Sequence, residues 1–186
     1  MNIVIISGTN RAGSMSLKLA NKLLSQYNQA DGIQASLLDL ATLPQELFLP
    51  SVYKEKPASF QSFQDAVLQA DGLLFIVPEY NGSFPGILKY FIDMWKYPES
   101  FEGRCVAYVG LSAGPWGGLR SVEHLQGVMG YRNAFQFPER VFINNIYDRW
   151  DWESGNLKKL TEKEYDLEDL ISSQTKHFIQ FCRNNR

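Results

Sequence analysis

Residues 2–16 of the chain read NIVIISGTNRAGSMS. The first part, residues 2–7, is a short apolar and β-rich run of the kind that a parallel sheet buries on both faces. After residue 16 the apolar residues recur at helical spacing, so a hydroxyl-rich loop connects a predicted strand to a predicted helix. Because the free N–H groups and the dipole at a helix N-terminus attract negative charge, this loop is predicted to bind a phosphate.

Neither of two well-known phosphate loops matches this stretch. The P-loop has a lysine after its last glycine, and Ser14 stands at that position here. The dinucleotide fingerprint has a glycine, which lets a pyrophosphate approach the backbone, where this chain has Asn10. A terminal monophosphate fits better, bound by the hydroxyls and the one cation of the loop: Thr9, Arg11, Ser14 and Ser16. The alternative for this loop alone is a surface turn before a capped helix.

Composition restricts the class of protein. The chain has 186 residues, of which 45% are hydrophobic, and a formal net charge of -2. This size predicts a single domain over residues 1–186. Without a basic surplus or an apolar run near ~20 residues, we expect neither a nucleic-acid partner nor a membrane partner. A strand that begins at Asn2 leaves no room for a signal peptide, and we expect a cytoplasmic protein with buried, reduced Cys105 and Cys182 and no metal site.

Apolar strands alternate with helical segments along the whole chain. Further strands are predicted at residues 33–38, 72–77, 104–110 and near 140–143, and helices near 16–29, 59–70, 85–96, 117–129 and 164–183. Five such β-α units predict an open parallel sheet with helices on both faces, which binds ligands at the carboxyl ends of its strands. Residues 40–57 and 147–159 are predicted to be long irregular loops that could line a site or an oligomer contact.

Two more loops follow the third and fourth predicted strands and should meet the first at the same sheet edge. Residues 78–86 read PEYNGSFPG, with a turn at Asn81-Gly82, and residues 111–119 read LSAGPWGGL, with three glycines beside Trp116. Tyrosine, backbone amides and glycine suit close contact with a flat polar ring. Each of these loops alone could be a simple turn before a helix. Together with a phosphate site, they match the shape of flavin mononucleotide (FMN).

At these three loops the chain resembles the NADPH-dependent FMN reductase family. The matching stretches are SGTNRAGS (residues 7–14), PEYNGSFPGILK (residues 78–89) and SAGPWGG (residues 112–118), and the resemblance covers roughly residues 1–145. It implies a flavodoxin-like three-layer sandwich, with a five-stranded parallel sheet in the order 2-1-3-4-5. It also implies FMN as cofactor, NADPH or NADH as hydride donor, and association as a homodimer or homotetramer. Family members reduce small-molecule electron acceptors: flavins, quinones, azo dyes or metal oxyanions.

The resemblance also implies roles for single residues. Thr9, Arg11, Ser14 and Ser16 would hold the FMN phosphate, although the family commonly has asparagine at the position of Ser16. Residues of the second loop would line the isoalloxazine, largely through backbone atoms: Pro78, Glu79, Tyr80, Asn81 and Gly82. Ser112, Gly114 and Gly117 would close the other side of the ring. Tyr90 replaces the usual asparagine of the following helix, and the region of Trp150 and Trp152 departs most from the family.

The reaction expected from the resemblance is hydride transfer from NADPH through FMN to an acceptor by a ping-pong mechanism. Flavin carries this chemistry, so no side chain is assigned as a catalytic acid or base. The chief alternative is a flavodoxin-type electron carrier without NADPH oxidation, but such carriers are usually strongly acidic. A second alternative is a Rossmann-type module in which Asp39 contacts a ribose, although an acid after a strand is more often a turn or cap residue.

Other conspicuous residues have structural interpretations. His124 and His177 lack a partner at metal-ligand spacing and are expected to be solvated or packed. Lys89 and Asp93 lie one helical turn apart, which indicates an exposed ion pair. The aromatic run of Trp95, Tyr97 and Phe101 is expected in the core or at a subunit contact rather than around a cofactor.

Overall fold

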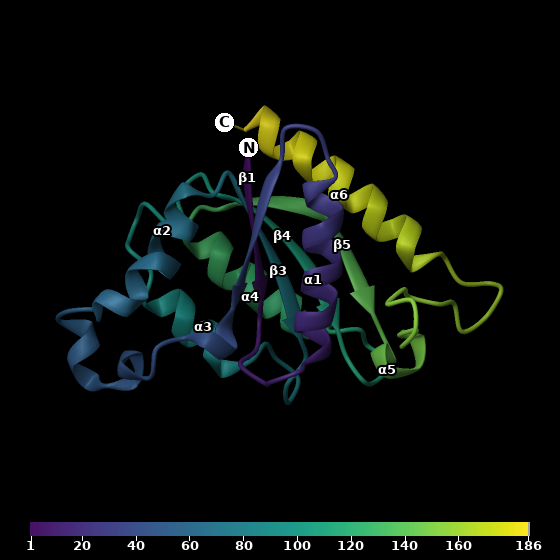
Figure 1. Cartoon of the computed structure of the whole chain (residues 1–186), viewed down its shortest axis with the longest axis horizontal. Coiled ribbons are helices and arrows are strands. Elements are labelled where there is room, and N and C mark those ends of the chain that lie inside the picture. Colours follow the sequence, from purple (N-terminus) through teal and green to yellow (C-terminus); the bar gives the residue numbers. More distant parts are fainter. Residues whose placement is uncertain (186) are drawn as a thin grey trace.

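A computed structural model describes residues 1–185 and shows a five-stranded, all-parallel sheet in the order β2-β1-β3-β4-β5 (Figure 1). The strands are β1 (Asn2–Ser7), β2 (Gln34–Asp39), β3 (Gly72–Pro78), β4 (Cys105–Leu111) and β5 (Phe135–Ile143). The α-helices are α1 (Met15–Asn28), α2 (Gln61–Gln69), α3 (Gly86–Asp93), α4 (Leu119–Tyr131), α5 (Ile146–Arg149) and α6 (Leu167–Asn184). The flavodoxin-like strand order predicted from the sequence is confirmed.

The central strands are buried on both faces, as their continuous apolar runs predict. Successive side chains of a strand point to opposite faces, so β1 contributes Ile3 and Ile5 to one core cluster and Val4 and Ile6 to the other. The first cluster lies beneath α1 and α6, and the second lies beneath α2, α3 and α4. Helices therefore cover both faces of the sheet, which gives the expected three layers.

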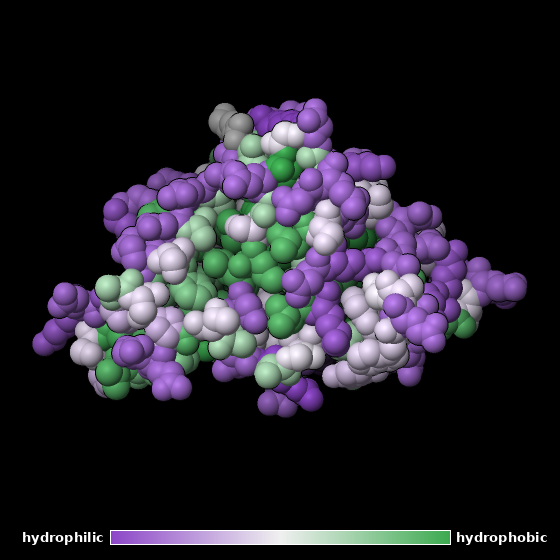
Figure 2. Space-filling view, viewed as in Figure 1, coloured by the Kyte–Doolittle hydropathy of each residue, from purple (hydrophilic) through white to green (hydrophobic). Residues whose placement is uncertain are grey.

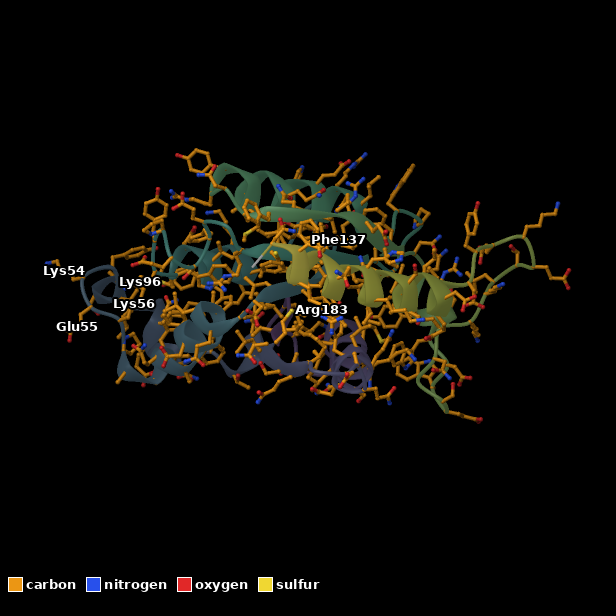
Figure 3. The ribbon with its side chains drawn as sticks, turned by 90° about the horizontal axis from the view of Figure 1, so that it is seen from above. Lys54, Glu55, Lys56, Lys96, Phe137 and Arg183 are labelled. Atoms are coloured by element: carbon orange, nitrogen blue, oxygen red, sulfur yellow. The ribbon has the colours of Figure 1, made fainter. Side chains whose placement is uncertain are left out.

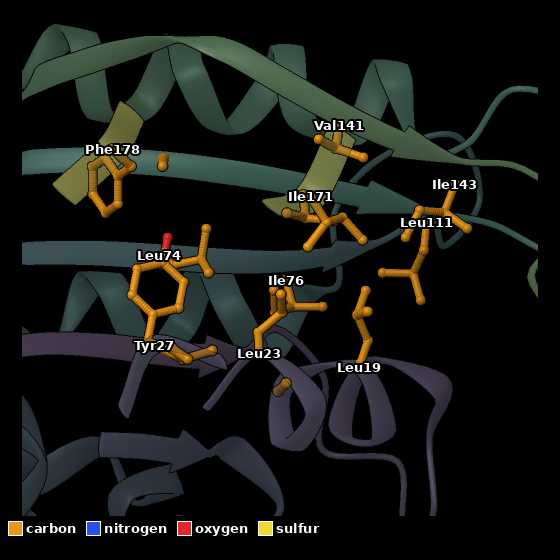
Figure 4. Close-up of a cluster of buried hydrophobic side chains, with 14 of the residues drawn as sticks. Leu19, Leu23, Tyr27, Leu74, Ile76, Leu111, Val141, Ile143, Ile171 and Phe178 are labelled. Carbon is orange, nitrogen blue, oxygen red and sulfur yellow. The ribbon is translucent and has the colours of Figure 1, made fainter. Parts of the chain in front are cut away.

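The first core cluster ties the two ends of the chain together. Figure 4 shows Leu23 and Tyr27 of α1 facing the sheet beside Leu74 of β3, with Ile171 and Phe178 of α6 on the same side. All five side chains are 0–1% exposed. The edge strand β2 is less covered, and Figure 2 shows hydrophobic residues at the centre of the face where β2 lies in Figure 1.

The last strand is longer than predicted. β5 begins at Phe135, whereas the sequence predicts a strand only near residues 140–143. The prediction begins late because Pro138 and Glu139 interrupt the apolar pattern by which a strand is recognised. Its register against β4 shifts between Val106 and Tyr108. A proline is tolerated there because β5 is an edge strand. The predicted helix 85–96 also ends earlier, at Asp93.

The two predicted loops have more structure than expected. Residues 40–60 contain four short 3-10 helices: η1 (Leu40–Thr42), η2 (Gln45–Phe48), η3 (Pro50–Tyr53) and η4 (Ala58–Phe60). Buried residues in the first three are Leu40, Leu47 and Val52. Lys54, Glu55 and Lys56 project from the outer end of this segment (Figure 3).

The segment after β5 is held by a partly buried ion pair. The Arg149 side chain is 4% exposed and donates to both carboxylate oxygens of Glu164, at 2.8 and 3.0 Å. Trp150 is buried and forms an isolated bridge with Leu157. Trp152 is 62% exposed, with the Lys18 ammonium 5.5 Å from its ring centre.

Cys105 and Cys182 are buried free thiols, as predicted. A hydrogen bond between them holds the pKa of Cys105 below its usual value. Over residues 1–185, no helix combines the length and apolar character needed to cross a membrane, and no cluster of histidine, cysteine or acidic residues is arranged to hold a metal.

Candidate functional site

The loops that follow β1, β3, β4 and β5 meet at the carboxyl edge of the sheet, at the bottom of Figure 1, and enclose a cavity of about 120 Å³. The predicted site residues that line this cavity are Arg11, Ser14, Ser16, Pro78, Glu79, Tyr80 and Ser112. The expected convergence of three loops at one edge is therefore present.

The first loop presents the N-terminus of α1 to the cavity. Ser14 is the N-cap residue: its hydroxyl accepts a hydrogen bond from the Leu17 amide at 3.1 Å, and its carbonyl accepts one from the Lys18 amide at 3.1 Å. The amides of Met15 and Ser16, earlier in the same turn, have no intrahelical acceptor. They therefore remain available to an anion, whose charge the helix dipole favours.

Arg11 and Ser16 also line this cavity. The Arg11 side chain is exposed and lines the cavity, and its guanidinium forms no hydrogen bond or ion pair with any of residues 1–185. Ser16 lines the same cavity and is 1% exposed. An unpaired cation beside free helix amides is the arrangement that a monophosphate requires.

Thr9 connects the first loop to the second. Its hydroxyl lies 2.9 Å from the Tyr80 hydroxyl and accepts a hydrogen bond from the Arg11 amide at 3.3 Å. Thr9 is 1% exposed and does not line the cavity. In this structure, its observed role is to join the two loops.

The second loop is a tight turn at the end of β3. Tyr80 and Ser83 exchange backbone hydrogen bonds of 2.8 and 3.1 Å. Between them, Asn81 and Gly82 have φ angles of 51° and 78°, the left-handed conformation that these residue types tolerate best. Asn81 and Gly82 lie outside the cavity lining, whereas Tyr80 lines it and is 37% exposed.

Glu79 has an unusual environment. Its amide donates to the Leu111 carbonyl at 3.0 Å, which fixes its backbone between the ends of β3 and β4. Its side chain lines the cavity, yet one carboxylate oxygen, Oε2, is buried without a hydrogen-bond partner among the described residues. Buried polar atoms are rarely left unpaired, so this oxygen indicates a missing donor.

The third loop is tied to the end of β5. The Ser112 hydroxyl donates to the Gly114 carbonyl at 2.8 Å, and that carbonyl also accepts from the Asn145 amide at 3.0 Å. Gly117 is buried with φ 61°, and a side chain there would meet Phe142 at 3.0 Å. Gly114 and Gly117 do not line the cavity, and in this structure Gly117 has a packing role.

Sequence reasoning missed several cavity residues. Ile146 and Tyr147, at the start of α5, line the cavity. Met15, Leu111 and Ala113 line it from the other loops. The signal for Ile146 and Tyr147 was their place after the fifth strand, whose carboxyl end meets the same edge. Tyr147 opens the segment 147–159, which we expected could line a site.

His124 also contacts the site. It is exposed on α4, and its Nδ1 lies 2.9 Å from the hydroxyl of Ser83 in the second loop. His177 pairs with Glu139 at 2.8 Å on the surface. Neither histidine lies in a metal cluster over the described part of the chain.

The remaining interpretations agree with the structure. Asp39 is the N-cap of η1 and accepts from the Ala41 amide at 3.0 Å, so it acts as a cap residue. Lys89 and Asp93 form the expected exposed ion pair at 2.7 Å.

The cavity fits only one end of FMN. Ligand cavities that enclose a whole drug-sized molecule measure about 300–1,000 Å³, whereas this cavity measures about 120 Å³. It can hold a phosphate and the adjoining polyol. A ring attached to that polyol would extend beyond this volume, and two of the lining residues, Tyr80 and Tyr147, are exposed to solvent.

Comparison with known proteins adds independent information. The family model for NADPH-dependent FMN reductase matches residues 1–148. A 2-hydroxy-1,4-benzoquinone reductase of a Burkholderia species is 31% identical over 169 residues, which cover 89% of this chain and 90% of that protein. An NAD(P)H-dependent FMN reductase of Pseudomonas aeruginosa is 33% identical over 156 residues, covering 81% of this chain and 82% of the relative. The flavoenzyme NAD(P)H:acceptor oxidoreductase FerB of Paracoccus denitrificans has the same fold, with a TM-score of 0.75 and 24% identity over 99% of this chain and 98% of that one.

Proposed function

Because the chain belongs to the NADPH-dependent FMN reductase family, we propose that it is an FMN-dependent oxidoreductase that transfers hydride from NAD(P)H to a small-molecule acceptor. A quinone is the acceptor class that we propose first, because a relative named as a benzoquinone reductase matches over most of both chains. Flavins, azo dyes and metal oxyanions are further candidates to be tested beside it.

The observation that carries this proposal is the unpaired cation at the N-terminus of α1. The Arg11 guanidinium and the free amides of Met15 and Ser16 meet in one cavity, and together they would hold the FMN phosphate. Thr9 joins this anion site to the Tyr80 turn, which would support the isoalloxazine. A hydrogen bond between the loops thus joins the two proposed parts of the cofactor site.

The chain's own contribution is to bind and orient the reactants. FMN, when bound, supplies the hydride chemistry. No side chain at the cavity is assigned as a proton donor or acceptor in the reaction. We propose a ping-pong order, in which NAD(P)H and the acceptor bind in turn beside Tyr80 and Tyr147, because both tyrosines line the cavity and are exposed to solvent.

The test begins with the visible spectrum of the purified protein and its titration with FMN. We expect flavin absorption bands, oxidation of NAD(P)H with a quinone as acceptor, and parallel double-reciprocal plots when both substrates are varied. A protein that binds FMN but does not oxidise NAD(P)H would be an electron carrier of the flavodoxin type. A protein that binds no FMN would refute the proposal altogether.

We further propose that copies of the chain associate through a groove of about 490 Å³ between α3 and α4. Trp95 and Phe101 are 5% and 4% exposed, as expected for core residues, whereas Tyr97 and Tyr131 are 63% and 78% exposed along this groove. The Arg132 guanidinium lies 4.6 Å and 5.0 Å from those two tyrosine rings. Tyrosine and arginine are enriched in protein interfaces. Light scattering should give the mass of a dimer or tetramer for the wild type. The Tyr131→Asp variant should have a lower mass, closer to that of a monomer. A monomeric wild type would contradict the proposal.

A further inference from the structure

We propose that the Glu79 carboxylate accepts hydrogen bonds from the ribityl hydroxyls of the flavin, and so selects flavins that carry this polyol. The inference rests on the proposed function, because it assigns a role toward the same cofactor. It gives Glu79 a side-chain role, in place of the backbone contacts with the ring that its position in the second loop implied.

The first step is the unpartnered oxygen. Glu79 Oε2 is buried and has no donor within the described chain. An acceptor that has lost its water and gained no partner destabilises the protein, more so when it carries charge. A ligand that brings a donor into the cavity would remove this penalty, so the flavin-free protein should bind such a ligand more tightly than one without a donor.

The second step concerns the donors that line the cavity together with Glu79. The hydroxyls of Tyr80 and Ser112 bond to Thr9 and to the Gly114 carbonyl. The other hydroxyls of the lining, those of Ser14, Ser16 and Tyr147, leave Glu79 Oε2 without a partner. Arg11 lines the same cavity, yet it forms no ion pair with Glu79. The carboxylate and the guanidinium are therefore both unpartnered, and they are not paired with each other.

The third step identifies the complementary ligand. This ligand must carry an anion that binds Arg11 and the amides of α1, and hydroxyl groups that donate to Glu79. The anion itself cannot bind to Glu79, because a phosphate next to a carboxylate is repelled. A short polyol that ends in a phosphate meets both demands, and a cavity of about 120 Å³ has room for it.

The experiment compares three flavins that differ in this tail. FMN has the polyol and the phosphate, riboflavin has the polyol alone, and lumiflavin has neither. Calorimetric titration of flavin-free protein would measure the affinity of each for the wild type and for Glu79→Leu. The matched control is Glu55→Leu, since Glu55 projects from the outer end of the 40–60 segment (Figure 3).

We expect Glu79→Leu to weaken FMN and riboflavin by the same factor, about 10- to 100-fold, the range for losing a hydrogen bond to a charged group. Lumiflavin affinity should change by less than about 3-fold. The flavin-free variant should also unfold at a higher temperature than the wild type, because a buried acceptor without a partner has been removed. Glu55→Leu should match the wild type in all flavin affinities.

Equal losses for all three flavins would place Glu79 at the ring and overturn the inference. So would unchanged affinities. If Glu79→Leu fails to fold, Glu79→Ala gives the same comparison, because it also removes the acceptor, and the same selective loss for FMN and riboflavin is expected. Failure of the proposed function looks different, because the wild type itself would then bind none of the three flavins.

Discussion

Replacing Arg11 with methionine removes the only cation among the described residues that line the cavity, while keeping a side chain of similar length. The guanidinium contacts no acid within the described residues, so its loss should leave the stability of the flavin-free protein nearly unchanged. Its effect should appear only when a phosphate is present. This separation makes the variant a specific probe of the anion site.

The magnitude follows from how the phosphate would be held. A hydrogen bond to a charged group contributes about 1.5–3 kcal/mol, and the exposure of Arg11 places it below the upper limit. The amides of Met15 and Ser16 stay in place in the variant, so binding weakens rather than vanishes. We expect a loss of about 2 kcal/mol, or roughly 30-fold in Kd for FMN.

The assay is flavin fluorescence quenching on titration with flavin-free protein, with riboflavin as the internal comparison. Riboflavin lacks the phosphate, so its Kd should be the same for wild type and Arg11→Met. Arg183→Met is the control, because Arg183 lies in the last turn of α6 and donates to the Asp31 carbonyl just before β2, at the amino end of the strands. An unchanged Kd for FMN, or an equal loss for riboflavin, would refute the assignment of the phosphate to Arg11.

Three further predictions concern stability. Ser14→Ala removes the side-chain cap of α1 and should lower the free energy of unfolding by about 1 kcal/mol; an unchanged urea midpoint would argue against the cap. Gly8→Ala places a Cβ 2.6 Å from a backbone carbonyl oxygen of β3 and should cost about 1–3 kcal/mol. Gly86→Ala, where the Cβ meets no atom within 4 Å, is its control, and similar melting temperatures for the two would contradict the clash. The Arg149 side chain lowers the pKa of Glu164 from 4.5 to about 2, so the stabilisation by this carboxylate is complete above pH 4.5 and is lost as pH falls toward 2. The difference in Tm between wild type and Glu164→Gln should narrow over this pH range, and a constant difference would speak against the ion pair.

The sequence was sufficient to predict the architecture and the sheet edge at which the loops converge. The fully apolar runs of β3 and β4 predict buried parallel strands, and parallel strands place their following loops at one edge. The loop that we propose for the phosphate was also recognisable in the sequence, because Ser14 and Arg11 lie within about one turn of the start of α1. These are local signals: each depends on residues that are neighbours in the chain.

Only the tertiary structure shows which of those residues bond to one another and which have no partner within the described chain. Thr9 is predicted to hold the phosphate, and only the folded chain shows that its hydroxyl also bonds to Tyr80, which lies 71 residues away in the chain. Glu79 was expected to act through its backbone, and its unpartnered oxygen is evident only once β4 and the opposite loops enclose it.

The sequence, with the family resemblance that it carries, was therefore enough to predict the strand order, the edge where the loops meet and the helix start that we propose as the anion site. The folded chain decided which polar groups satisfy one another and which are left for a ligand. The physical reason is that apolar periodicity and helix capping depend on short stretches of chain, whereas hydrogen-bond satisfaction in a cavity depends on groups brought together from distant loops.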